Sequence, residues 1–413
     1  MSAYSTTIDD PRIVDPDKHK IKVLIACFLG YAMDALDMMV MALALPLIVK
    51  AFNISLVAAS SIAVATNLGA AIGAILWGPI ADKIGRRKAL IICISWFTVW
   101  AVLCGFANNV TTIAIFRFIA GLGLGGEWAV GAALLTEFWP ADKRAWAAGI
   151  CQSSWAFGYF LALGVNISLV PIFGWRILFW SASLGVICLI MLLFVPESPV
   201  WLTHKDEIIK GNKKKVGIME LLAPDVRKNF IWATLLCVGA MVSYWGLGTF
   251  MPTLLKDTRG LDNTTMSYIL MVTYAASFFG YYFFAWIAER FGRRNEMIIG
   301  SIVGVIMTFI FLNMEGGWVY LIVAIMGFVS PGYWSPLSAF LAELSPTRVR
   351  ASFIGITFGI GKWVIIVVPY AVSAIAATKG LTFALYITTS FFLLVTISAF
   401  LLKETKGTEI TAD

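Results

Sequence analysis

Long apolar stretches alternate along the whole chain with short polar segments that carry most of the charge. A helix needs roughly 20 apolar residues to cross the hydrocarbon core of a bilayer. The pattern therefore predicts an all-α membrane protein with twelve transmembrane helices. The predicted spans are about 21–49, 57–80, 89–106, 111–138, 143–170, 175–195, 229–253, 264–288, 296–313, 316–342, 349–378 and 381–402.

A pattern of charged and small residues occurs twice, about half a chain apart. The two copies read Glu137-x-x-Pro140-x-x-x-Arg144-x-x-x-x-Gly149 and Glu343-x-x-Pro346-x-x-x-Arg350-x-x-x-x-Gly355. Upstream of each copy, the charged segment 82–87 matches the segment 289–294. Such a repeat in an apolar chain predicts two similar helical bundles, with a site where they meet.

We therefore predict two six-helix bundles that are joined by a charged linker. The boundaries are an N-terminal cytoplasmic tail at 1–20, a bundle at 21–195, a cytoplasmic linker at 196–228, a bundle at 229–402 and a cytoplasmic tail at 403–413. Lys and Arg are enriched in the cytoplasmic loops of membrane proteins. Here they gather in the segments that share a side with both ends of the chain, which predicts cytoplasmic N- and C-termini.

The composition agrees with a protein of the cell membrane that has the lipid bilayer as its surroundings. Hydrophobic residues make up 60% of the chain, charged residues 13%, and the mean hydropathy is +0.85, which excludes an ordinary soluble protein. The bias of basic residues toward one side accounts for the net charge of +7, so no nucleic-acid partner is expected. Nothing in the pattern requires an oligomer, and we expect a functional monomer.

Several kinds of chemistry are not expected from these residues. The six cysteines lie in predicted spans without a C-x-x-C pair, so we expect no disulfide, no metal site and no cofactor. No phosphate-binding loop occurs, so uphill transport must draw on an ion gradient. Both histidines lie outside the spans, which leaves carboxylates for any proton relay. No nucleophile, base and orienting group can be assembled, so we do not expect an enzyme.

The segment 78–88, Gly-Pro-Ile-Ala-Asp-Lys-Ile-Gly-Arg-Arg-Lys, resembles the signature of the major facilitator superfamily between its second and third helices. The R-x-x-x-G-x-G pattern that begins at Arg117 resembles its fourth-helix motif. Segments 196–202 and 404–407 resemble those that end the two halves in the sugar-porter-like and metabolite:proton symporter branches. The resemblance covers nearly the whole chain and implies the major facilitator fold.

Three features look most like the branch that contains aromatic-acid and sialate:proton symporters. They are Asp34-x-x-Asp37 in the first helix, Gly-Gly-Glu-Trp ending at Trp128, and the cation Lys362 in the eleventh helix. The branch usually has glycine where this chain has Ala35, and arginine where it has Lys362. Lysine offers a point charge in place of a planar two-pronged donor, so the resemblance implies a proton-coupled transporter without naming its substrate.

The carboxylates of Asp34 and Asp37 are the first candidates for proton coupling. Their spacing places both on one face of a helix, well inside the membrane. Two neighbouring carboxylates in a medium of low dielectric constant cannot both ionise cheaply, which suits the uptake and release of a proton. The alternative is a structural pair, bonded to backbone or to Arg117.

Three further ionisable residues fall within predicted spans, where they are rare unless they are paired, face water or have a function. Arg117 needs a partner, and the candidates are Asp34 or Asp37, a substrate carboxylate or the backbone; the resemblance favours a charge relay with an aspartate. Glu127 is either a second protonation site or a neutral buried acid. Lys362, near the bilayer midplane, binds either an anionic substrate or an aspartate that releases it on protonation.

Charged residues of the repeated motifs lie at the predicted cytoplasmic ends of helices. In the family that the chain resembles, such residues form salt bridges on the inner side that part when the bundles rock. We expect this conformational gate to consist of Asp82, Arg86, Glu137, Arg144, Glu289, Arg293, Glu343 and Arg350.

Aromatic residues make up 14% of the chain, and most of them are expected to pack between helices or face lipid. Those near mid-span or beside glycines are candidates for the apolar wall of a substrate site. They include Tyr31, Trp128, Trp155, Tyr159, Tyr244 and Tyr333.

Together these features predict a secondary active transporter that carries a small organic anion, a monocarboxylate or aromatic acid, in symport with H⁺ by alternating access. Asp34 and Asp37 would carry the proton, Arg117 would tune them, and Lys362 would receive the anion. The alternatives are a transporter of a neutral or cationic solute, such as a sugar, polyol or organic amine, a uniporter, and Na⁺ in place of H⁺.

Overall fold

The computed structural model describes residues 15–212, 217–255, 260, 263–314 and 316–410, and this part of the chain contains helices and no strand. The predicted tails and linker therefore lie partly outside the described residues. The first half contains α1 (Pro16–Phe52), α2 (Leu56–Ile84), α3 (Arg86–Cys104), α4 (Val110–Phe138), α5 (Arg144–Ser168), α6 (Val170–Phe173), α7 (Arg176–Trp180), the 3-10 helix η1 (Ser181–Leu184) and α8 (Gly185–Leu193).

The second half begins after a connecting segment that holds a helix not foreseen from the sequence, α9 (Pro199–Ile209), and the 3-10 helix η2 (Ile218–Leu222). Ser198 caps α9, because its side chain accepts a hydrogen bond from the Trp201 amide and Pro199 starts the helix. The remaining helices are α10 (Arg227–Thr253), α11 (Asn263–Phe291), α12 (Arg293–Asn313), α13 (Trp318–Val329), α14 (Leu337–Leu344), η4 (Thr347–Val349), α15 (Arg350–Lys379) and α16 (Leu381–Leu401).

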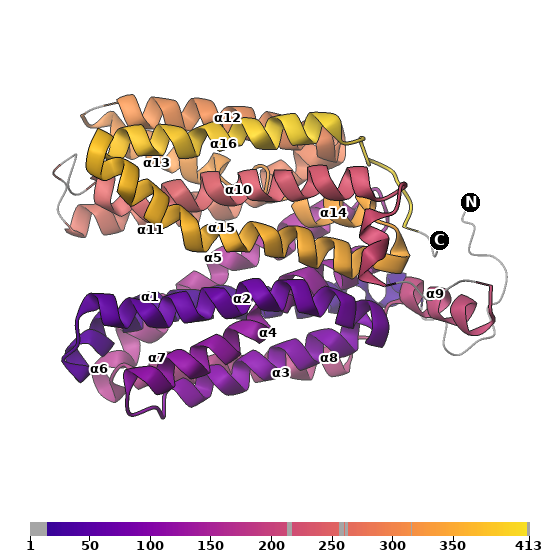
Figure 1. The fold of residues 1–413 in the computed structure, drawn as a ribbon, viewed down its shortest axis with the longest axis horizontal. Helices are drawn as coiled ribbons and strands as arrows, with labels where there is room; N and C mark the ends of the chain where they lie inside the picture. The colour runs from indigo at the N-terminus through magenta and orange to yellow at the C-terminus, as the bar shows by residue number, and fades with distance from the viewer. Residues whose placement is uncertain (1–14, 213–216, 256–259, 261–262, 315, 411–413) are drawn as a thin grey trace.

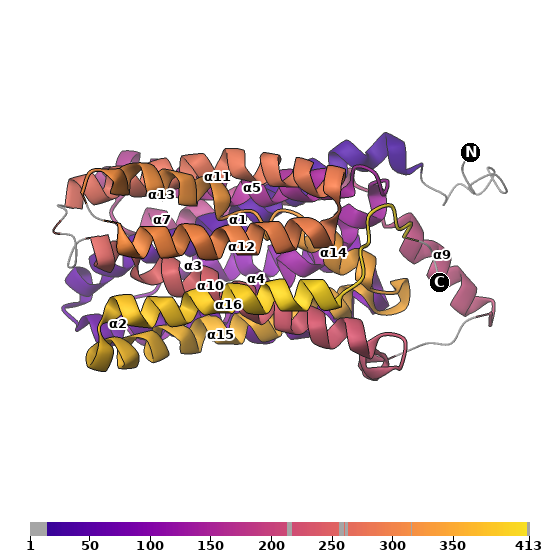
Figure 2. The same cartoon turned by 90° about the horizontal axis from the view of Figure 1, so that it is seen from above.

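The long helices run roughly parallel to one axis and form two groups (Figure 1). Helices α1 to α8 make one group and α10 to α16 the other, with α2 beside α15 and α5 beside α11 where the groups meet. Helix α1 begins and α16 ends at the same end of the molecule, close to α9 (Figure 2). We call this the terminal end.

Ten helical segments within the described residues are long and apolar enough to cross a membrane. Of the twelve predicted spans, the tenth, 316–342, is not one helix, because α13 stops at Val329 and α14 starts at Leu337. Pro331 and Pro336 lie in the gap, and proline removes a backbone donor and clashes with the preceding helical turn. Helix α5 is 25 residues long but is not among the ten, and it carries Gln152 on its buried side.

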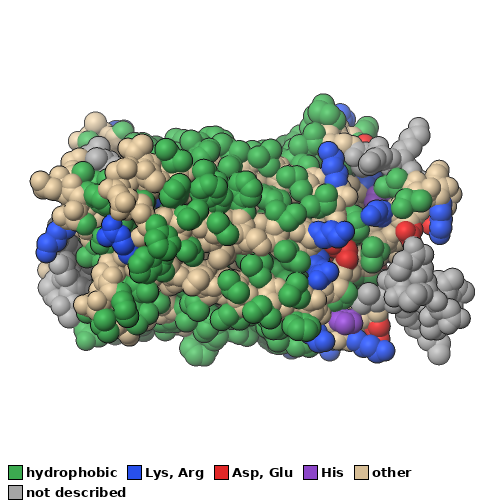
Figure 3. Space-filling view, turned by 90° about the horizontal axis from the view of Figure 1, so that it is seen from below, with side chains coloured by type: hydrophobic (Ala, Val, Ile, Leu, Met, Phe, Trp, Pro, Cys, Tyr) green, Lys and Arg blue, Asp and Glu red, His purple; other side chains and the backbone are tan. Residues whose placement is uncertain are grey.

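The surface of the molecule fits a protein embedded in lipid. Hydrophobic side chains cover the middle of the face seen in Figure 3, whereas Lys and Arg gather toward its two ends. Many large apolar side chains are exposed, including Val99, Phe279 and Phe400. In water a protein with such a surface would aggregate, but in a bilayer these apolar side chains contact equally apolar lipid tails.

Small residues let the two groups approach each other closely near the terminal end. A Cβ atom on Gly78 of α2 would lie 2.5 Å from the carbonyl oxygen of Ala351 in α15. A Cβ atom on Gly149 of α5 would lie 2.6 Å from Ser335 Oγ, in the break between α13 and α14. These glycines hold the halves in backbone contact at this end, as small residues do between membrane helices.

Candidate functional site

A cavity of about 450 Å³ lies between the two groups of helices. It extends toward the end opposite the terminal end, where Leu45, Ala63 and Thr249 line it. At its other limit, Gln152 and Phe358 close the bottom. Of the residues predicted for the site, the cavity is lined by Tyr31, Asp34, Asp37, Arg117, Trp155, Tyr159, Tyr244 and Lys362.

Asp37 and Arg117 form a buried two-pronged ion pair. The two guanidinium nitrogens of Arg117 donate to the two carboxylate oxygens of Asp37 at 2.6 and 2.7 Å, and Arg117 Nε donates to Thr66 Oγ1 at 3.1 Å. The exposed fraction is 0% for Arg117 and 1% for Asp37. Of the partners considered for Arg117, the structure selects Asp37. This geometry is the strongest form of charged hydrogen bond between side chains.

Asp34 and Lys362 lie in the same cavity but form no ion pair with any described residue. Asp34 stands one helical turn before Asp37 on α1 and is 7% exposed. Lys362 comes from α15 in the other half, and its Nζ lies 5.3 Å from the centre of the Phe358 ring. The cavity therefore holds one carboxyl and one ammonium, on opposite halves, that are not engaged in an ion pair within the described part of the chain.

Aromatic rings form one wall of the cavity. The rings of Tyr31 and Trp155 lie 5.3 Å apart between their centres, and those of Trp155 and Tyr159 5.5 Å apart. From the other half, Tyr244 contacts Trp334 with ring centres 5.6 Å apart. Rings at these separations attract each other and offer flat apolar faces to a small planar ligand.

Two predicted wall residues do not line this cavity. Trp128 lies beneath it, where its ring stacks on Phe358 with centres 3.9 Å apart and its Nε1 donates to Gln152 Oε1 at 2.7 Å. Tyr333 is 1% exposed and lies behind Trp334. Trp128 and Phe358 belong to opposite halves, so their stack closes the cavity on the side of the terminal end.

Glu127 also lies outside the main cavity. Its side chain is 1% exposed and its Oε2 has no hydrogen-bond partner among the described residues. It lines a small separate void that shares Tyr31 and Gln152 with the main cavity. The structure thus places Glu127 next to the predicted site, on the terminal side of it.

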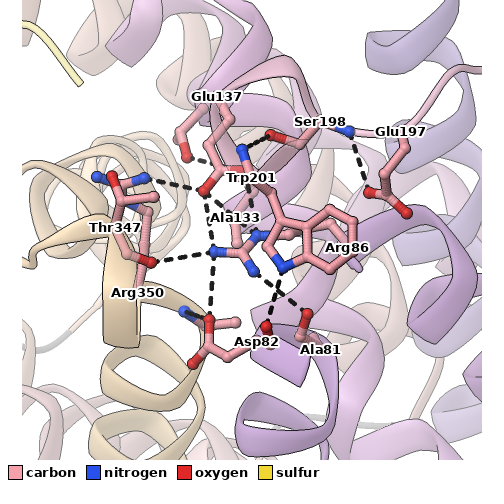
Figure 4. Close-up of polar contacts among 12 residues, drawn as sticks. Ala81, Asp82, Arg86, Ala133, Glu137, Glu197, Ser198, Trp201, Thr347 and Arg350 are labelled. Atoms are coloured by element: carbon pink, nitrogen blue, oxygen red, sulfur yellow. Dashed lines mark hydrogen bonds and ion pairs between the residues drawn. The ribbon is translucent and has the colours of Figure 1, made fainter. Parts of the chain in front are cut away.

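Four residues of the predicted gate form one ion cluster at the terminal end, which we call the first ion cluster: Asp82, Arg86, Glu137 and Arg350. Glu137 of α4 accepts from Arg86 at 3.2 Å and from Arg350 Nη1, which belongs to the other half, at 2.9 Å (Figure 4). Asp82 accepts from the Ser352 amide of α15 at 2.8 Å and also pairs with Arg86 at 3.2 Å. The cluster therefore ties α2 and α4 to the start of α15.

The other four residues form the second ion cluster: Arg144, Glu289, Arg293 and Glu343. Glu343 lies 3.3 Å from Arg293 of its own half and 3.0 Å from Arg144 of the other half. Glu289 accepts from the Trp146 amide at 3.0 Å and pairs with Arg293 at 2.9 Å. The pattern repeats the first cluster with the halves exchanged, so all eight predicted gate residues lie in two matching clusters.

Some residues of these clusters were missed from the sequence. Glu197 accepts from the Arg87 amide at the start of α3, and Glu404 accepts from the Arg293 amide at the start of α12. Ser198 bonds Glu137, as Thr405 bonds Glu343 at 2.6 Å. The signal was present: Glu197-Ser198 and Glu404-Thr405 occur at matching places in the two halves.

Glu296 is a further buried acid that the sequence did not single out, and it lines neither the main cavity nor the void beside Glu127. It lies in the first turn of α12, is 0% exposed, and neither of its carboxylate oxygens has a hydrogen-bond partner among the described residues. Because Glu296 falls at the edge of an apolar run, the sequence pattern alone indicates only that a predicted span ends there. Its position is close to Gly300, where an added Cβ atom would lie 3.3 Å from Glu296 Oε1.

Comparison with known proteins gives the same family as the motifs. The family model described as the Major Facilitator Superfamily matches residues 27–369 and 235–411. The chain is similar to the cis,cis-muconate transport protein of Acinetobacter baylyi, with 29% identity over 93% of this chain and 94% of that one. It is also similar to the benzoate transport protein of the same organism, with 27% identity over 83% of this chain and 80% of the other.

Among solved structures, the proton:xylose symporter XylE has a similar fold, with a TM-score of 0.77 and 20% identity over 95% of this chain and 98% of that one. At that identity the likeness shows the fold alone. The family match covers most of the chain, and the structure supplies apolar helices, a cavity between two halves and a charged end. This chain belongs to the Major Facilitator Superfamily and is a multi-pass membrane transporter.

Proposed function

We propose that the chain is a proton-coupled symporter of a small organic anion, a monocarboxylate or aromatic acid, that works by alternating access as a monomer in the cell membrane. The bundles would be residues 21–195 and 229–402, joined by the linker 196–228, with both termini in the cytoplasm. The observation that carries the proposal is that the ammonium of Lys362 forms no ion pair with a described residue, in a cavity whose other cation, the buried Arg117, is already paired.

An unpaired ammonium within the membrane costs several kcal/mol, so it favours any arrangement that supplies an anion. Asp34 is the one acidic side chain of the cavity that forms no ion pair in the described structure. When Asp34 is ionised it can balance Lys362 across the cavity. When it takes up a proton, the positive potential of Lys362 is released, and a substrate carboxylate can take its place. This exchange links one proton to one anion.

The shape of the cavity supports a small planar substrate. Its volume of about 450 Å³ is within the range of about 300–1,000 Å³ for small-molecule sites. Tyr31, Trp155 and Tyr244 offer ring faces, and Lys362 offers one cation. The relatives named for benzoate and cis,cis-muconate transport carry substrates of this chemical kind by their names.

Alternating access would be governed by the two ion clusters. Both clusters join the halves at the terminal end, while the cavity extends toward the opposite end. If the termini are cytoplasmic, this arrangement is the outward-facing state. Substrate and proton binding would then stabilise a state in which the clusters have parted, because a ligand shifts a conformational equilibrium by its differential affinity.

The test is uptake into proteoliposomes under an imposed pH gradient, with labelled aromatic carboxylates, amines and sugars. We expect carboxylate uptake that falls at least tenfold when the gradient is collapsed, and that is abolished in Lys362→Gln but partly kept in Lys362→Arg. Carboxylate uptake that is unchanged without any gradient or sodium would show a uniporter.

The alternative substrate, an organic amine, is favoured by the unpaired Asp34 carboxyl, which would be its counter-ion. In that case Lys362→Gln would keep substrate binding and Asp34→Asn would abolish it. A sugar or polyol would require neither charge for binding, as the fold shared with a xylose symporter permits.

A further inference from the structure

Glu127 is a buried carboxyl at the boundary between the two halves, and it forms no ion pair with a described residue. A Cβ atom on Gly30 would lie 2.5 Å from Glu127 Oε1, so one oxygen lies directly against the backbone of α1. The other oxygen, Oε2, is fully buried and has no hydrogen-bond partner among the described residues. A carboxylate in that position would be a buried charge without compensation, so the side chain is stable there only while it carries its proton.

Beside Glu127 lies a void of about 10 Å³. A site needs on the order of 10–15 Å³ of such volume to hold one water molecule. Its walls come from both halves, since Cys27, Trp128 and Cys151 belong to the first half and Ser338 of α14 to the second. A void at this boundary opens when the halves separate.

The void is next to the main cavity, because the two spaces share lining residues. Tyr31 and Gln152 line both spaces. The groups that face Glu127 electrostatically are Asp34, Lys362, Tyr31 and buried thiols, which include Cys27 and Cys151. Asp34 is therefore the acid of the main cavity that faces Glu127.

Along α4, Glu127 stands midway between the paired arginine of the cavity and the first ion cluster. Ten residues separate it from Arg117 and ten from Glu137, and at 1.5 Å per residue each interval is about 15 Å. Asp37 is held by both guanidinium nitrogens of Arg117. Asp34 and Glu127 are the acids along this route that form no ion pair with a described residue.

We propose that Glu127 is the release site of the transported proton, which it receives from Asp34 and gives up at the terminal end. This inference rests on the proposed proton symport. When the ion clusters part, water enters the void, the O–H bond of the Glu127 carboxyl breaks, and this water accepts the proton. The O–H bond of the Asp34 carboxyl then breaks, water passes that proton on, and a new O–H bond forms on Glu127. Glu127 is neutral again before the halves close, and one proton has crossed in the cycle.

The test uses Glu127→Gln, which keeps the shape and is permanently neutral, in the full chain in proteoliposomes. Two readouts are compared: counterflow exchange of labelled substrate without a gradient, and acidification of the lumen recorded by a trapped pH dye during substrate uptake. We expect Glu127→Gln to keep exchange within about twofold and to lose lumen acidification and pH-driven accumulation by at least tenfold. Glu127→Asp should keep part of both.

The matched control is Glu296→Gln, which neutralises the other fully buried acid without a hydrogen-bond partner in the described structure. It should behave as the unaltered chain in both readouts. Glu127→Gln that still acidifies the lumen at the unaltered rate would overturn the proposal, as would loss of exchange and acidification together. If the unaltered chain itself shows no acidification, the symport proposal fails instead.

Discussion

The cavity and the terminal end differ in how their buried charges are paired. At the terminal end, Glu137 and Glu343 each meet two arginines, one from their own half and one from the other. In the cavity, the single ion pair of the described residues, Asp37 with Arg117, lies within one half, and Lys362 has no carboxylate within ion-pair distance.

The difference underlies the roles proposed above for the two regions. A carboxylate with two cations has little to gain from a proton or a ligand, which supports a conformational role for the ion clusters. Lys362 forms no ion pair with a described residue and would gain from an anion that enters, which supports its proposed role in binding. Both regions lie in surroundings of low dielectric constant, where such imbalances are worth several kcal/mol.

The largest effect is expected from breaking the cavity's one ion pair. Arg117→Gln leaves Asp37 as a buried charge without its partner, which costs about 3–5 kcal/mol. Thermal unfolding followed by tryptophan fluorescence in detergent should show a large drop in the midpoint. The double variant Asp37→Asn/Arg117→Gln should recover stability but not uptake. Arg117→Gln with an unchanged midpoint would mean that the pair is not the tight contact seen here.

The next effect concerns the equivalence of the two ion clusters. Glu137→Gln and Glu343→Gln each remove the charge that faces two arginines, and a hydrogen bond to a charged group is worth about 1.5–3 kcal/mol, so the closed terminal end should loosen in both. Spin labels on the exposed Lys83 and Arg290, in a background without the six cysteines, report the distance between halves. Both variants should populate a longer distance to a similar extent. An unchanged distance in either variant would show that the two ion clusters do not contribute equally to closure.

A smaller effect is expected where the cavity meets the closed end. Trp128→Phe keeps a ring against Phe358 but removes the hydrogen bond to Gln152, which is worth about 0.5–1.5 kcal/mol. The same pair of spin labels should report a rise of a few fold in the open population. The lost bond positions Gln152, whose Nε2 donates to the Trp334 carbonyl of the other half at 3.4 Å. Trp96→Phe is the matched control, because Trp96 also loses one hydrogen bond, to the Ile119 carbonyl, but its ring contacts the Trp100 ring of its own half. Equal shifts in both variants would show that Trp128 has no specific role in keeping the terminal end closed.

The smallest effect belongs to the exposed contact between the linker and η4. Arg348 donates to Asp225 at 2.5 Å, and this hydrogen bond holds the pKa of the Asp225 carboxyl below its usual range. A lowered carboxyl pKa stabilises the fold above the usual value of about 3.9, and the contribution is lost as pH falls through the lowered value. Asp225→Asn should therefore cost at most about 1 kcal/mol at pH 7 and nothing in strong acid, by thermal unfolding at both pH values.

The fold and the residues of the two ion clusters could be predicted because their signals are local and repeated. Apolar runs of bilayer length place most of the helices, and the duplicated motifs single out all eight residues of the ion clusters. The break between α13 and α14 could have been read from Pro331 and Pro336, but a run that is apolar throughout conceals it. Helix α9 is short and charged, and in a linker its pattern is weak.

The partners inside the membrane could not be predicted in the same way. Asp34 and Asp37 stand on one helical face with the same chemistry, and only the packing of α1 against α4 gives Arg117 to Asp37. Likewise Trp128 follows Glu127 directly in a motif, yet one stacks across the boundary between halves and the other faces a separate void.

The sequence by itself determined that this chain is a duplicated helical membrane protein with ionisable groups in its spans, because hydrophobic length, basic-residue bias and repeated motifs are properties of neighbours along the chain. The tertiary structure decided which of the charged side chains form ion pairs and which do not. That outcome depends on contacts of a few ångströms between helices far apart in sequence, and at such distances in low-dielectric surroundings a small difference in packing decides whether a charge has a partner.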